Sequence, residues 1–117
     1  VVDPESVSPD DPQKTVIDKF VSTFEAKYGY RPVYVEGFGY DAIRIAVAAL
    51  KEVGPDREKI KDFINNLKNF PGVLGMYNFD PKNNRTGHSY EDLILVEINN
   101  GKWKKVEDLR SRVLQYQ

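Results

Sequence analysis

Hydrophobic side chains recur with helical spacing in three segments of the chain. The first segment follows "SPDDPQ", with Asp11 as the predicted N-cap, Pro12 as the first helical residue and Gly29 just past the end. Its apolar positions lie three and four residues apart, and the positions between them are mostly charged or polar. The predicted inward-facing residues are Val16, Ile17, Phe20, Val21, Phe24 and Tyr28. This pattern predicts an amphipathic surface helix.

The second segment, about Tyr40 to Val53, is apolar on nearly all of its surface. It ends at Gly54, which occupies the usual position of glycine after a helix, and Pro55 follows directly. The predicted inward face comprises Ala42, Ile43, Ala46, Val47, Ala49, Leu50 and Val53, and Ile45 and Ala48 widen it. A helix that is apolar on most sides requires cover on most sides.

A third helix is predicted in "REKIKDFINNLKNF", with Asp56 as its N-cap. Its apolar residues recur at i, i+3, i+4 and i+7, so one face packs and the other is solvated. These residues are Ile60, Phe63, Ile64 and Leu67.

Extended structure is predicted in three places. "YRPVYVEGF" favours a short strand that ends near Glu36, and Met76 to Phe79 favours a brief one. "DLILVEINNGKWKKV" predicts a hairpin through Asn100-Gly101, a pair that tolerates the positive φ of a type I′ turn. Leu93 to Ile98 is apolar on both faces except at Glu97, which is typical of a strand covered on both sides.

The order of helix, strand, two helices and then β-structure predicts part of an α/β architecture. At 117 residues the chain has the size of one domain. A buried strand and a nearly all-round apolar helix both require cover that this chain barely contains. We therefore expect either a piece of a larger protein or a chain that relies on a partner copy.

Composition narrows the classes of function. A hydrophobic fraction of 40% and a charged fraction of 30% argue against disorder, since both are near ordinary globular usage. The net charge of −1 provides no basic surface for nucleic acid. Because cysteine is absent, disulfides and thiolate chemistry are excluded. The longest apolar run, Ile45 to Leu50, is far shorter than the roughly 20 residues of a membrane span.

Residues that could carry catalysis or bind a metal do not form a known pattern. His88 is the only histidine, and its proximity in sequence to Ser89 and Asp92 is not the spatial geometry of a triad. The glycines of "EGFGYDA" match no phosphate-binding loop. A calcium-loop spacing is also absent from Asp80, Asn83 and Asn84. We therefore predict no catalytic residue, no metal, no cofactor and no enzymatic activity.

Phe38 and Tyr40 are the candidate ligand-binding residues. They lie where the predicted strand ends and the second predicted helix begins. In open α/β sheets, this carboxyl-terminal edge is where ligands collect. The other aromatic residues at element ends are expected to pack in the core or at its margin.

Several segments together resemble one protein family. They are "FVSTFEAKYG", "GYDAIRIAVAAL", "DREKIKDFINNLKNFPGVLGMYNFDP" and "EDLILVEINNGKWKKV", and they span Pro12 to Val106. In order and spacing they are similar to the C-terminal part of type I periplasmic binding proteins of the branched-chain amino acid class, the substrate-binding subunits of ABC transporters.

The resemblance implies a two-lobed, three-layer α/β/α sandwich that is incomplete in this chain. Residues 12–92 would belong mainly to one lobe, and residues 93–106 would form a closing β-hairpin after a hinge crossing. Residues 107–117 would form a C-terminal tail, helical or frayed. Most residues that grip a ligand lie upstream in the family, so we expect little or no amino acid binding by the isolated segment.

The implied function is non-enzymatic binding of a branched-chain type amino acid or related small carboxylate. The implied partner is an ABC permease, and the implied location is the periplasm or the outer face of a membrane to which the protein is anchored. Phe38 and Tyr40 would make apolar or stacking contacts to the ligand side chain. In the alternative interpretation, Tyr40 packs the lobe while Asp41 caps its helix.

Three other classes of protein remain open. The first is a ligand-sensing receptor or regulator domain of the same fold. The second is a small enzyme, which no visible constellation of residues supports. The third is a short domain that self-associates through an exposed strand edge.

Overall fold

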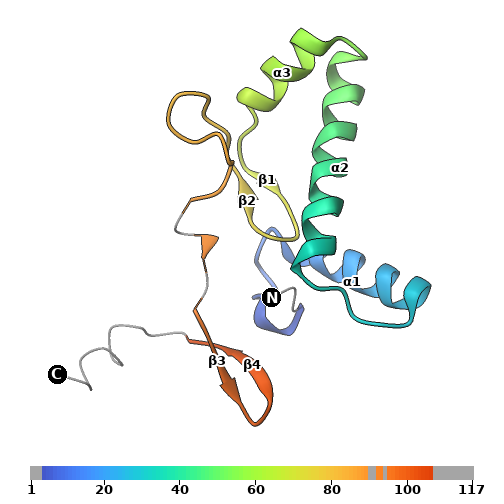
Figure 1. Ribbon diagram of the computed structural model, residues 1–117, viewed down its shortest axis with the longest axis vertical. Helices are drawn as coiled ribbons and strands as arrows, with labels where there is room; N and C mark the ends of the chain where they lie inside the picture. The colour runs from blue at the N-terminus through green and yellow to red at the C-terminus, as the bar shows by residue number, and fades with distance from the viewer. Residues whose placement is uncertain (1–3, 90–91, 94, 107–117) are drawn as a thin grey trace, which may run out of the picture.

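The computed structural model describes residues 4–89, 92–93 and 95–106, and the predicted tail at 107–117 lies outside them. Three helices and two separate hairpins make up this part of the chain (Figure 1). The elements are a 3₁₀ turn η1 (Pro4–Ser6), α1 (Lys14–Tyr28), α2 (Tyr34–Val53), α3 (Arg57–Asn65), β1 (Phe70–Pro71), β2 (Met76–Tyr77), β3 (Val96–Asn99) and β4 (Lys102–Lys105). Helix α2 is the longest of these elements. Helix α1 lies at its amino-terminal end, and α3 folds back at its other end (Figure 1).

Helix α1 begins at Lys14, two residues later than the sequence predicts. The Asp11 carboxylate accepts the Gln13 backbone N–H at 2.8 Å, so it closes a turn ahead of the helix instead of capping it. At the other end the prediction is confirmed, because Gly29 has φ of 75° and its N–H donates to the Glu25 carbonyl.

Helix α2 begins at Tyr34, so the strand predicted in "YRPVYVEGF" is wrong. The Glu36 carboxylate reaches back to accept the Val33 N–H at 3.0 Å, which satisfies one backbone donor at the helix start. Gly37 packs against Leu74, at a distance where an added Cβ would lie 3.1 Å from the leucine side chain. This cap and this contact outweigh the β propensity of Val33, Tyr34 and Val35.

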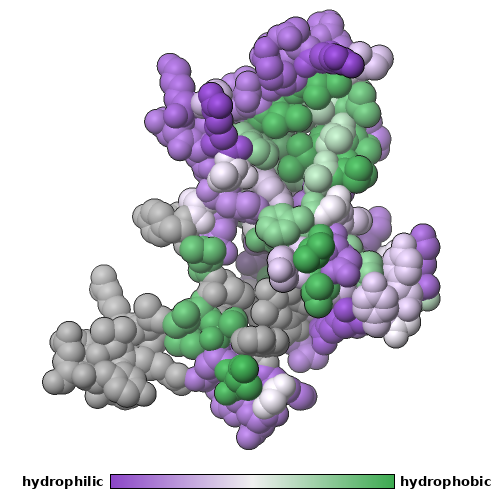
Figure 2. Space-filling view, in the orientation of Figure 1, coloured by the Kyte–Doolittle hydropathy of each residue, from purple (hydrophilic) through white to green (hydrophobic). Residues whose placement is uncertain are grey.

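The buried side of α2 is Asp41, Ile45 and Ala49, spaced four residues apart. Ile45 is therefore at the centre of the packed face, where the sequence predicted it at the margin. Much of the predicted face is open, and Ile43 is 66% exposed. Figure 2 shows the resulting apolar patch over α2.

Helix α3 has the predicted N-cap but is shorter than predicted. The Asp56 carboxylate accepts the N–H groups of Glu58 and Lys59 at 3.0 and 3.1 Å. The helix ends at Asn65, and the Leu67 carbonyl then accepts the Phe79 N–H at 3.0 Å. This bond ties the segment after α3 to the chain that follows β2.

Both sheets are two-stranded and antiparallel. Strand β1 pairs with β2, which is shorter than the predicted Met76 to Phe79, and β3 pairs with β4. Asn100 and Gly101 have φ of 51° and 76°, which confirms the predicted hairpin turn. The predicted cover on both faces of Leu93 to Ile98 is absent from the described residues, since Ile98 is 69% exposed.

The core lies between α1 and the turn that joins β1 to β2. Ile17, Phe20 and Val21 of α1 pack around Val73 of that turn. Tyr40 and Leu74 are partly buried against this cluster. The turn is thus held between α1 and the first half of α2.

Among the described residues, no helix combines the length and the apolar composition that a membrane span requires.

Candidate functional site

Asp41 is the one fully buried charged side chain among the described residues, with 0% exposure. Its carboxylate accepts the Val73 N–H at 2.8 Å, the Leu74 N–H at 3.1 Å and the Tyr77 hydroxyl at 3.1 Å. Asp41 lies inside α2, so the interpretation that it caps the helix is wrong. It fastens the β1–β2 turn to α2, and we call these bonds the Asp41 network.

Arg44 supplies the compensating positive charge. Its guanidinium lies 3.8 Å from the Asp41 carboxylate and donates to the Pro71 carbonyl at 2.6 Å. It also lies over the Phe70 ring, 4.8 Å from the centroid. The buried carboxylate is therefore paired and hydrogen-bonded, as a buried charge must be.

Gly72 allows the close approach on which this network depends. A Cβ built at residue 72 would lie 2.3 Å from the Tyr77 ring and 2.6 Å from the Asp41 carboxylate. The Gly72 N–H donates to the Gly75 carbonyl at 2.9 Å, which closes the turn. Only glycine fits at this position without displacing two buried side chains.

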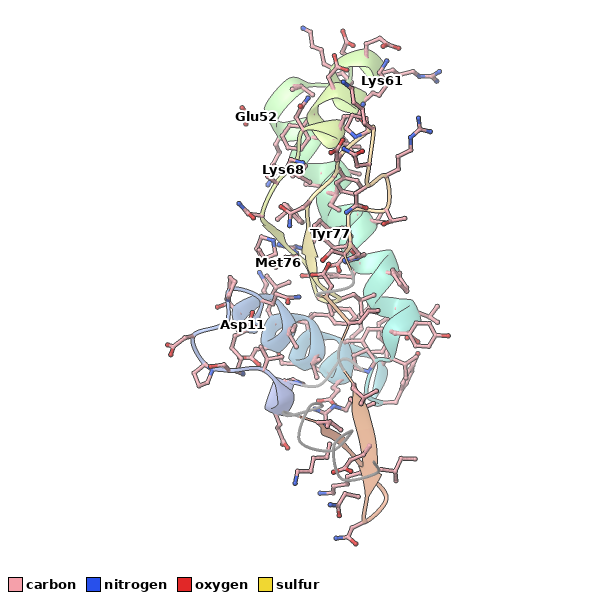
Figure 3. The ribbon with its side chains drawn as sticks, turned by 90° about the vertical axis from the view of Figure 1, so that its left-hand side faces the viewer. Asp11, Glu52, Lys61, Lys68, Met76 and Tyr77 are labelled. Carbon is pink, nitrogen blue, oxygen red and sulfur yellow. The ribbon has the colours of Figure 1, made fainter. Side chains whose placement is uncertain are left out.

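Tyr77 lies on the hairpin beside α2 (Figure 3). Burial raises the pKa of its phenol well above its ordinary value, and the neighbouring Asp41 carboxylate raises it further. A group whose folded-state pKa is raised contributes stability below its unfolded-state pKa, about 10 for tyrosine, and loses that contribution as pH rises further.

We therefore expect the stability of the protein to fall more steeply above about pH 10 than that of the Tyr77→Phe variant. At neutral pH the variant is the less stable of the two, because it lacks the hydrogen bond to Asp41. Urea unfolding at a series of alkaline pH values measures both effects, with Tyr34→Phe as the exposed-tyrosine control. Equal alkaline slopes for wild type and Tyr77→Phe would contradict this expectation.

Phe38 lines a hollow of about 320 Å³ between α2, α3 and the segment from β2 to His88. Phe38 as a whole residue is 53% exposed. The other lining residues are Ala42, Ile45, Ile64, Tyr77, Phe79, Thr86 and His88, and we call this cavity the Phe38 hollow. It is mainly apolar and has the small volume of a ligand pocket.

His88 is one of the residues that line the Phe38 hollow. Its ring packs against Tyr77 with centroids 4.2 Å apart, and both ring nitrogens are buried without a hydrogen-bond partner among the described residues. The Asp92 carboxylate is 3.7 Å from His88 Nδ1 and accepts the Ser89 backbone N–H at 2.6 Å. These contacts pack a loop and do not form the relay of a catalytic triad.

Tyr40 lies on another side of α2. Residues two apart on a helix differ in direction by about 200°, and the Tyr40 ring packs on Phe20 with centroids 4.7 Å apart. It lines a separate groove with α1. The structure therefore does not bring Phe38 and Tyr40 together in one cavity, and neither lies at the end of a strand.

Sequence reasoning missed the roles of Asp41, Gly72 and Tyr77. The available signal was a carboxylate within an otherwise apolar helix, which requires buried donors. The sequence did not show that those donors lie about 30 residues further along the chain, at Val73 and Leu74. Within the described residues, no group of three acidic or histidine side chains is placed to hold a metal ion.

The chain matches a family model described as "Periplasmic binding protein" over residues 1–102. A search of curated proteins finds no match. Among solved structures, an extracellular ligand-binding receptor from Rhodopseudomonas palustris HaA2 is 26% identical with a TM-score of 0.75, covering 91% of this chain and 32% of that one. A second protein from Rhodopseudomonas palustris, strain CGA009, is 25% identical with a TM-score of 0.73 and the same coverage.

A leucine binding protein, LivK, from Thermotoga maritima is 29% identical with a TM-score of 0.58. The match covers 89% of this chain and 27% of that one. The chain thus spans about a third of the length of the structures that it matches. Because the family model matches residues 1–102 and the chain superposes on these relatives with TM-scores of 0.58 to 0.75, the chain belongs to the periplasmic binding protein family and has part of its type I fold.

Proposed function

We propose that the protein is the solute-binding component of an ABC importer, which binds a branched-chain type amino acid or related small carboxylate and passes it to a membrane permease. The observation that carries this proposal is the family match over residues 1–102. LivK is described as a leucine binding protein, which supports the choice of ligand. Since the chain spans about a third of its relatives, this activity belongs to the whole protein.

Within this chain, we assign the contact with the ligand side chain to Phe38. Its exposed ring borders a mainly apolar hollow, and an aliphatic side chain would gain by leaving water there. Tyr77, which also lines the hollow, is held by the Asp41 network. Because this side chain is already ordered, less side-chain entropy is lost when a ligand binds.

The β3–β4 hairpin supports the division of the chain at a hinge. It projects away from the unit of α1, α2, α3 and the β1–β2 hairpin (Figure 1). We propose that residues 12–92 belong to one lobe and that residues 93–106 follow a hinge crossing. Ligand-driven closure of the two lobes would then be the signal to the permease.

The proposed location is the periplasm, or the outer face of a membrane to which the protein is anchored. The protein from Rhodopseudomonas palustris HaA2 is described as an extracellular ligand-binding receptor. That description also favours a second candidate, a ligand-sensing receptor of the same fold. Loss of solute uptake on deletion of the gene, measured with radiolabelled ligand, would support the importer over the receptor.

Phe38→Ala is expected to weaken amino acid binding about tenfold. Burial of a phenylalanine side chain contributes about 1.5 to 3 kcal/mol, and a tenfold change in affinity corresponds to about 1.4 kcal/mol. The measurement is isothermal titration calorimetry with leucine, isoleucine and valine. The protein should be expressed in its native host, so that it is obtained as the cell makes it.

Val35→Ala is the matched control, because Val35 is an exposed apolar residue of the same helix and does not line the hollow. Its affinity should equal that of wild type. Wild-type affinity in Phe38→Ala would remove Phe38 from the site. Absence of binding to any amino acid or small carboxylate would contradict the proposed function itself.

A further inference from the structure

A second cavity lies between α1 and the first turns of α2, on the side away from the Phe38 hollow. Its volume is about 330 Å³. The lining residues are Lys19, Phe20, Thr23, Phe24, Lys27 and Tyr28 of α1, with Glu36 and Tyr40 of α2, and we call it the Tyr40 groove. Every lining residue belongs to these two helices, so the groove is formed by a short, contiguous part of the chain.

Aromatic rings form the floor of the Tyr40 groove. Phe20 lies between Tyr40, at 4.7 Å, and Phe24, at 5.7 Å between centroids. Phe24 in turn packs on Tyr28 at 4.5 Å. Phe20 is buried in the core while Tyr28 is exposed, so the row of rings runs from the interior to the surface. A planar aromatic ligand would find ring faces and edges to pack against along this row.

The charges at the rim are asymmetric. Lys19 and Lys27 are exposed residues of α1 and have no carboxylate within ion-pair distance among the described residues. By contrast, Lys14 pairs with Asp18 on the same helix. Lys27 extends over the Tyr28 ring, 5.2 Å from its centroid, which keeps its ammonium at the groove.

Glu36 is the one acidic residue that lines the groove, and its carboxylate already accepts the Val33 N–H at 3.0 Å. The groove therefore presents, beside its aromatic rings, two ammonium groups that pair with no carboxylate in the described part of the chain. Such an arrangement attracts an anion and disfavours a cation. A carboxylate attached to an aromatic ring satisfies both features, whereas inorganic phosphate would leave the rings uncovered.

We propose that the Tyr40 groove binds a small aromatic carboxylate, with its ring on Phe24 and Tyr40 and its carboxylate between Lys19 and Lys27. This site is separate from the Phe38 hollow, and the inference does not rest on the proposed importer function. It gives Tyr40 a role in ligand binding that is independent of the Phe38 hollow.

The test is calorimetry of the 117-residue chain with phenylacetate, paired with amide NMR to locate the bound ligand. We expect saturable binding, with shifts concentrated in α1 and the first turns of α2. Cyclohexylacetate, which keeps the charge without the ring, should bind about threefold to tenfold more weakly. Phenylacetamide, which keeps the ring without the charge, should bind about tenfold more weakly.

The decisive variant is Lys19→Gln/Lys27→Gln, which is expected to weaken phenylacetate binding about tenfold. Lys19→Arg/Lys27→Arg should restore binding because it keeps both charges. Lys51→Gln/Lys59→Gln is the matched control, since it removes two exposed charges elsewhere and should leave the affinity unchanged. All four lysines are exposed, so these variants are expected to fold.

Several results would overturn the proposal. They are no saturable binding of phenylacetate, equal affinity in Lys19→Gln/Lys27→Gln and wild type, or shifts confined to the Phe38 hollow. Much tighter binding of an acetylated phenylalanyl-aspartate peptide would point to a protein partner in place of a small molecule. This experiment uses phenylacetate and reports on the Tyr40 groove. A negative result would therefore overturn this proposal and would not bear on amino acid binding at Phe38, which the Phe38→Ala experiment tests.

Discussion

Asp41→Ala is expected to lower the free energy of unfolding by about 3 to 5 kcal/mol, which is the range for breaking a buried charged pair. The substitution leaves the N–H groups of Val73 and Leu74 and the Tyr77 hydroxyl without their acceptor. It also leaves the Arg44 guanidinium without its nearby carboxylate. Each unsatisfied buried donor costs about 1 to 3 kcal/mol. Urea unfolding followed by circular dichroism measures the loss.

Asp62→Ala is the matched control, because Asp62 is an exposed aspartate within α3. Its effect should stay within about 0.5 kcal/mol, as for most surface substitutions. Asp41→Asn adds a further arm, since the amide keeps the shape and one acceptor while removing the charge. If Asp41→Ala unfolds at the same urea concentration as Asp62→Ala, the Asp41 network does not hold the β1–β2 turn.

Gly72→Ala is expected to destabilise the protein by about 3 kcal/mol, at the upper end of the usual range for overpacking. The new methyl group would lie 2.3 Å from the Tyr77 ring and 2.6 Å from the Asp41 carboxylate. Tyr77 and Asp41 are buried and hydrogen-bonded to each other, so neither is free to move aside. The same unfolding measurement applies.

Gly39→Ala is a control with the opposite expected sign. Gly39 lies within α2, and an added Cβ there would meet nothing within 4 Å. Alanine in a helix interior is favoured over glycine by about 0.5 to 1 kcal/mol, so this variant should be more stable than wild type. Destabilisation by both variants to a similar extent would show that close packing at Gly72 is not the cause.

The Asp41 network also links the stability of the fold to ligand binding in the Phe38 hollow. The Asp41 network holds Tyr77, and Tyr77 forms a wall of the Phe38 hollow. Loosening the network should therefore widen the hollow and weaken binding there. The Tyr40 groove does not contain Tyr77. In a variant that still folds, such as Asp41→Asn, amino acid affinity should fall more than phenylacetate affinity.

Local chemistry determined several features of the fold. Gly29 ends α1, Asp56 caps α3, and Asn100-Gly101 turns the β3–β4 hairpin, all as predicted. Each of these features depends on a backbone conformation or a cap formed within a few residues. The order of the segments was also sufficient for the correct family, since the resemblance to type I periplasmic binding proteins is confirmed.

Tertiary contacts decided where α2 begins and which of its faces is buried. Tyr34 to Gly37 is helical although its residues favour a strand, because Glu36 caps the helix start and Gly37 packs against Leu74. The buried face follows Asp41, whose donors come from a turn distant in sequence. Hydrophobic periodicity alone could not select that face, since α2 is apolar almost all round.

The candidate site also depends partly on local sequence and partly on tertiary contacts. The sequence by itself indicated Phe38 and Tyr40 as ligand-binding candidates where a predicted strand ends and a predicted helix begins. The tertiary structure placed them in two cavities, because α1 packs against one side of α2 while α3 and the segment after β2 pack against another. A side chain's direction follows from its place on the helix, but its neighbours depend on segments that only folding brings together.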